Sequence, residues 1–71
     1  MKKLLKQYGL NSDFSYFEMI VASYMNGQRT QAKNQFSVMT KEYKKSFIKS
    51  ALTHWESGLS QRNIVELIDL I

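Results

Sequence analysis

Few residues of this chain could carry out catalysis or bind a metal ion. His54 is the single histidine, and the chain contains no cysteine that could pair with it. A histidine can act as a general base or a metal ligand, but a packed or surface side chain is the commoner role. One histidine and six acidic residues show no metal-ligand spacing. Glu66 and Asp69, three residues apart, fit a solvated helix face better than acid–base chemistry.

The glycines also give no sign of a catalytic or nucleotide-binding loop. There are three of them, well separated, and none belongs to a glycine-rich segment that precedes a Lys-Ser or Lys-Thr pair. We therefore expect that the protein is not an enzyme. We expect no catalytic, metal-binding or cofactor-binding residues, and no small-molecule substrate.

The basic residues offer a different chemistry, the binding of phosphate groups. Ten lysines and arginines exceed the six acidic residues by four charges, and nine of the ten precede residue 50. Such an excess favours encounter with polyanions, although a well-solvated surface can have the same composition. The candidate nucleic-acid contacts in this part of the chain are Arg29, Lys33, Lys41, Lys45 and Lys49.

Residues 58–64, Gly-Leu-Ser-Gln-Arg-Asn-Ile, resemble the opening of a helix-turn-helix unit in bacterial regulators. In one alignment residues 60–70 form the first helix, and a recognition helix would have to follow them. In the other alignment Gly58 is the turn glycine and residues 60–71 form the recognition helix. The side chains that could then read bases are Gln61, Arg62 and Asn63.

Other residues around this motif fit a DNA-binding unit poorly. His54 stands where a small residue is usual, and Ser57 stands where an apolar one is usual. Glu66 and Asp69 would repel phosphates. A well-capped helix start also selects Gly-x-Ser. The alternative function is therefore a small basic nucleic-acid-binding protein with a partial helix-turn-helix-like element at residues 53–71.

A surplus of apolar side chains indicates a protein interface instead. Several apolar residues lie off the main helical stripes, and a second apolar face on a short helix often contacts another protein. A domain this small also cannot bury every apolar group. The leading hypothesis is thus a non-catalytic helical interaction or accessory protein that acts by protein–protein binding or self-association. The possible interface residues are Tyr16, Met19, Val65 and Leu70.

Helical periodicity and helix-end signals divide the chain into one short helix and four longer ones. The chain has no proline, and Gly9, Gly27 and Gly58 each follow a periodic segment, where a left-handed helix end is expected. We predict that Gly58 has a positive φ. The expected helices span residues 2–8, 13–26, 28–38, 41–57 and 60–71.

Suitable N-capping residues stand at the start of three of these helices. Ser12 or Asp13 can cap the second helix, Thr40 the fourth and Ser60 the last. Leu59 and Ile64 stand on either side of Ser60 at the spacing of a hydrophobic staple.

The apolar stripes of these helices predict the core. Replacing Trp55 with alanine should destabilise the fold by about 3–5 kcal/mol. Lys44 falls inside an apolar arc, so its side chain must extend to solvent or meet a partner. The expected core residues are Phe14, Phe17, Val21, Tyr24, Phe36, Tyr43, Phe47, Ala51, Trp55, Ile64, Leu67 and Ile68.

Length and composition limit the protein to a single helical domain, residues 1–71. With 44% hydrophobic residues it can form one modest core, and short connections favour an all-α bundle of about four helices with an extra short N-terminal helix. No apolar run approaches the roughly 20 residues of a membrane span. The basic start, Met1-Lys2-Lys3, is not followed by the apolar region of a signal peptide. We therefore expect no membrane contact and a cytoplasmic protein.

Part of the chain resembles a group of small helical proteins. Residues 16–48 contain Tyr-Phe-Glu-Met-Ile-Val, Asn-Gly-Gln-Arg-Thr-Gln-Ala and Met-Thr-Lys-Glu-Tyr-Lys-Lys-Ser-Phe-Ile. In these segments the chain is similar to uncharacterised helical proteins of phages and bacterial mobile elements. The resemblance implies a bacterial or phage setting, and it assigns no role to any residue.

Overall fold

Five α-helices account for most of the chain in the computed structural model, which describes residues 1–54 and 59–71, apart from the side chain of His54. No strand occurs within these ranges, so the expected all-α fold with a short N-terminal helix is confirmed. The predicted positive φ of Gly58 and the predicted burial of Trp55 concern residues outside the described ranges. The helices are α1 (Lys2–Gln7), α2 (Asp13–Met25), α3 (Arg29–Ser37), α4 (Lys41–His54) and α5 (Gln61–Ile68).

Two glycines end α1 and α2, as the sequence predicts. Gly9 has φ +67° and Gly27 has φ +78°, a conformation that an L side chain strains. At the end of α2 the amide of Gln28 donates to the carbonyl of Ser23 at 2.8 Å, and the amide of Gly27 donates to that of Tyr24 at 3.1 Å. This is the Schellman arrangement, and it pairs carbonyl groups that the helix itself leaves unpaired.

The N-termini of three helices are capped by hydroxyl side chains. The Ser12 hydroxyl accepts from the Ser15 amide at 3.1 Å, so Ser12 rather than Asp13 caps α2. The Thr40 hydroxyl accepts from the Tyr43 amide at 3.4 Å. Ser60 caps α5 as predicted.

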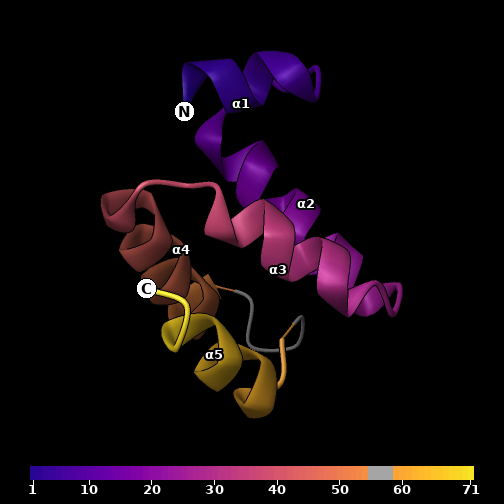
Figure 1. Cartoon of the computed structure of the whole chain (residues 1–71), viewed down its shortest axis with the longest axis vertical. Coiled ribbons are helices and arrows are strands. Elements are labelled where there is room, and N and C mark those ends of the chain that lie inside the picture. Colours follow the sequence, from indigo (N-terminus) through magenta and orange to yellow (C-terminus); the bar gives the residue numbers. More distant parts are fainter. Residues whose placement is uncertain (55–58) are drawn as a thin grey trace.

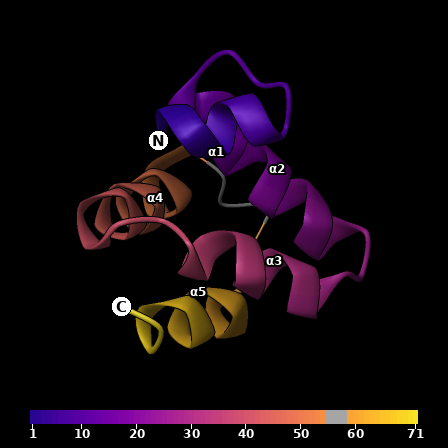
Figure 2. The same cartoon turned by 45° about the horizontal axis from the view of Figure 1, so that its top comes forward.

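Helices α2 and α3 pack against each other, α5 packs against α4, and α1 lies at the opposite end of the molecule from α5 (Figures 1 and 2). Ala32 of α3 is completely buried, which allows close approach of the helices. Two buried hydrogen bonds join α2 to α3. The Tyr16 hydroxyl donates to the Gln35 carbonyl at 2.7 Å, and the Ser23 hydroxyl lies 3.0 Å from the Gln35 side-chain oxygen.

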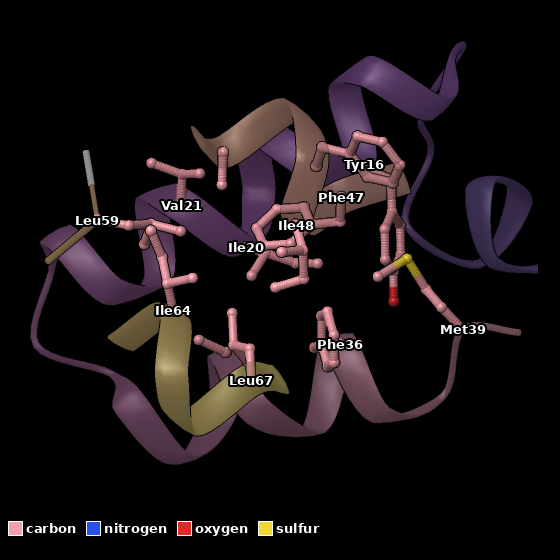
Figure 3. Close-up of a cluster of buried hydrophobic side chains, with 13 residues drawn as sticks. Tyr16, Ile20, Val21, Phe36, Met39, Phe47, Ile48, Leu59, Ile64 and Leu67 are labelled. Carbon is pink, nitrogen blue, oxygen red and sulfur yellow. The ribbon is translucent and has the colours of Figure 1, made fainter. Parts of the chain in front are cut away.

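Phe47 of α4 lies at the centre of the core. Its ring meets that of Phe17 at a centroid distance of 5.4 Å and that of Phe36 at 5.7 Å, both edge to face, a favourable geometry for aromatic pairs. One aromatic cluster therefore links α2, α3 and α4. Figure 3 labels Phe36 and Phe47 of this cluster. The full cluster is Tyr16, Phe17, Ile20, Val21, Ala32, Phe36, Met39, Phe47, Ile48, Ala51, Leu59, Ile64 and Leu67.

Two predicted core residues are exposed to solvent. Phe14 is 52% exposed and Ile68 is 47% exposed, so their predicted burial is wrong. On α2 the buried face is centred on Tyr16 and Ile20, and at 100° per residue Phe14 lies about 200° away from Tyr16. Tyr24 and Tyr43 are only partly buried and pack at the edge of the core.

Candidate interaction surfaces

The start of helix α5 is fixed by a hydrogen-bonded cap and by buried apolar side chains. The Ser60 hydroxyl accepts from the Asn63 amide at 3.1 Å, and Leu59 and Ile64 are both buried beside Val21 (Figure 3). This arrangement confirms the predicted cap and staple.

An ion pair also fixes α5 against α3. The Arg29 guanidinium pairs with the Glu66 carboxylate, and its Nε donates to Oε2 at 3.0 Å. The Glu66 side chain is 19% exposed and the Arg29 side chain 54%, so solvent screens the pair from the arginine side and its contribution to stability is small.

The opposite side of α5 leaves apolar side chains in solvent. Val65 is 54% exposed, Ile68 47% and Ile71 39%. We call these three residues the α5 apolar edge. They follow one another at steps of three residues, so they lie along one side of the helix and its C-terminal turn. Val65 is one of the residues predicted to form an interface, whereas Ile68 was expected in the core. Leu70, also predicted at the interface, is partly buried against the core.

The remaining predicted interface residues lie on α2 and form no comparable surface. Tyr16 has no exposed area, so its predicted place at an interface is wrong. Its ring packs edge to face against that of Tyr8, the residue that follows α1, with centroids 5.8 Å apart. Met19 is partly buried against the core. The cause is that α1 and α3 both pack on α2, which buries more than one face of that helix.

Burial raises the pKa of two tyrosines, Tyr16 and Tyr24. It raises the pKa of Tyr16 to about 12, with a smaller contribution from Tyr8. The pKa of Tyr24 is raised by burial as well, and Arg29 partly offsets the rise. The Tyr24 hydroxyl is buried and has no hydrogen-bond partner within the described ranges.

Three predicted phosphate contacts form a regular line on α4. Lys41, Lys45 and Lys49 are four residues apart and all exposed, and we call them the α4 lysine row. No ion pair joins any of them to another described residue. The neighbouring Lys44 faces the other way. Its Nζ donates to the Leu70 carbonyl at 3.4 Å, which confirms that this lysine meets a partner.

The two basic residues predicted on α3 are less available than the α4 lysine row. The charge of Arg29 is paired with Glu66, and Lys33 is partly buried. The predicted binding role of Arg29 therefore competes with its ion pair, and Lys33 is less exposed than the α4 lysine row.

The triplet Gln61, Arg62 and Asn63 occupies the first turn of α5. Gln61 and Arg62 are exposed, while Asn63 is partly buried and its amide donates to Ser60. The turn on which a helix-turn-helix alignment depends includes Gly58, which lies outside the described ranges. Helix α5 itself has two exposed polar side chains, Gln61 and Arg62, at its start and the α5 apolar edge further along.

No other kind of site is seen among the described residues. They contain no cluster of three or more histidine or acidic side chains that could hold a metal ion. No pocket is found in the described parts of the chain. Within ranges 1–54 and 59–71, no helix has both the length and the apolar character needed to cross a membrane.

Comparison with known proteins adds no family to this description. No protein-family model matches the chain, and no significant match was found among curated proteins or among solved structures.

Proposed function

We propose that this is a non-catalytic interaction protein that binds another protein, or a second copy of itself, through the α5 apolar edge. The observation that supports the proposal is the exposure of Val65, Ile68 and Ile71 along one side of α5 and the turn that follows it. Ile64 and Leu67 of the same helix are buried in the core. Adjacent exposed apolar side chains are typical of contact surfaces, whereas isolated ones are not.

The expected strength of this contact follows from the exposed fractions. Full burial of an aliphatic side chain contributes about 1.5–3 kcal/mol, and the three edge residues are each roughly half exposed. Covering them would therefore contribute about 2–4 kcal/mol. Association costs at least about 4 kcal/mol in lost freedom of movement. The edge thus directs binding, and a stable complex needs further contacts around it.

The test combines sedimentation over a wide concentration range with retrieval of protein partners from a bacterial extract. We expect either a concentration-dependent increase in mass or a specific partner. Val65→Lys should weaken that association, because it places a charge in the contact. Met25→Lys is the matched control, since Met25 is an exposed apolar residue at the end of α2 and gains the same charge.

A strict monomer at high concentration that retrieves no partner would refute the proposal. Equal effects of the two lysine substitutions would refute the assignment to α5, because the association would then depend on general surface hydrophobicity.

A further inference from the structure

We infer that the α4 lysine row binds the phosphate backbone of nucleic acid, independently of the α5 apolar edge and without reading base sequence. Each four-residue step advances about 6 Å along a helix and rotates by about 40°. Lys41, Lys45 and Lys49 therefore span about 12 Å on one face of α4. A nucleic-acid strand advances about 3.4 Å per charge, so the row can lie along three or four phosphates.

The charge of the row is available for an external partner. None of its three lysines forms an ion pair with another described residue, whereas Arg29 is paired with Glu66 and Lys44 is directed to Leu70. Glu42 is the one acidic residue in α4. Like charges four residues apart repel each other and destabilise a helix. A polyanion would relieve that repulsion.

The even spacing of the row is the feature that favours a nucleic-acid strand. Lysine acts as a point charge toward phosphates and carboxylates alike, so the choice of partner rests on the spacing of the charges. The row consists of lysines alone, at even spacing, which suits a repeating phosphate chain. The polar side chains suited to base contacts, Gln61 and Arg62, lie on α5 instead. We therefore expect binding that is independent of sequence.

The experiment measures binding of fluorescent random-sequence duplex and single-stranded DNA by anisotropy across a range of salt concentrations. The variant with Lys41→Gln, Lys45→Gln and Lys49→Gln should have a duplex salt slope smaller by about 2.7, because each phosphate contact contributes about 0.9. For single strands the decrease should be about 2.1. When salt rises from about 50 to about 200 mM, the natural chain should therefore lose about 40-fold more of its duplex affinity than the variant loses.

A matched control separates the row from net charge. The variant with Lys2→Gln, Lys3→Gln and Lys6→Gln loses the same three charges from exposed positions on α1, and its salt slope should stay close to that of the natural chain. Glu42→Gln should raise the affinity for DNA, because it removes the acidic neighbour of the row. We expect tighter binding of this variant at low salt, and circular dichroism should show that all variants stay helical.

Three results would overturn the inference. The first is no DNA binding by the natural chain at low salt. The second is an equal change of slope in the row variant and the α1 variant, which would show an effect of net charge alone. The third is row-dependent binding of polyglutamate that is as tight as that of DNA, which would assign the row to acidic proteins.

Discussion

Tyr16 and Tyr24 stand two turns apart on α2, and removal of the hydroxyl group should destabilise the fold at Tyr16 but not at Tyr24. The Tyr16 hydroxyl donates to the carbonyl of Gln35 at 2.7 Å. That carbonyl lies in the last turn of α3, where the helix itself leaves carbonyl groups unpaired. The Tyr24 hydroxyl is buried with no hydrogen-bond partner among described residues. Tyrosine to phenylalanine is thus the same chemical change in two different settings.

The magnitudes follow from these two settings. Tyr16→Phe removes a hydrogen bond and leaves a buried carbonyl without its partner, which should lower the free energy of unfolding by about 1.5–2.5 kcal/mol. In a domain of this size, that corresponds to a decrease of roughly 6–20 °C in Tm. Tyr24→Phe removes a group that was already unpaired. We expect a change between zero and an increase of about 1 kcal/mol.

Urea denaturation followed by circular dichroism measures both variants against the natural chain. Similar m-values would show that the comparison concerns stability rather than the size of the folded unit. Equal destabilisation by the two substitutions would refute the reasoning. It would show that the hydrogen bond from Tyr16 to Gln35 adds no stability beyond that of an unpaired tyrosine hydroxyl. A loss of stability confined to Tyr24→Phe would refute it as well.

Two further predictions concern pH and the start of α5. Because the pKa of folded Tyr16 is raised to about 12 from an unfolded value near 10, its contribution to stability is complete below about pH 10 and is lost as the pH rises toward 12. Thermal melts from pH 8 to 12 should show that decline, and it should be smaller in Tyr16→Phe. Ser60→Ala removes the hydroxyl that accepts from the Asn63 amide and should cost about 1 kcal/mol in urea denaturation. A neutral result at Ser60 would mean that the cap does not hold α5.

The local part of the fold could be read from the sequence with good accuracy. Gly9, Gly27, Ser12, Thr40 and Ser60 mark helix ends by their own chemistry, and the structure places a helix end at each of them. Positive φ and N-cap hydrogen bonds depend on residues within one turn. Such signals need no knowledge of the rest of the chain.

The candidate surfaces could be predicted only in part, because apolar periodicity shows that a helix has an inner face but not how many neighbours cover it. On α2 the sequence pattern favoured Phe14 over Tyr16 for burial, and packing by both α1 and α3 reversed that order. On α5 the stripe included Ile68, but the helix meets the core through Ile64 and Leu67 and leaves Ile68 half exposed.

By itself, the sequence determined the helical class, the helix ends at Gly9, Ser12, Gly27, Thr40 and Ser60, and the shortage of catalytic groups, since composition and short-range hydrogen bonding are sufficient for these. Only the tertiary structure decided which charges are available. Lys44 and Lys45 are adjacent in the chain, yet one donates to the Leu70 carbonyl and the other is exposed. Arg29 and Glu66 are 37 residues apart and meet because the fold brings α5 beside the first residue of α3. Such pairings depend on elements distant in the chain, and no local pattern specifies them.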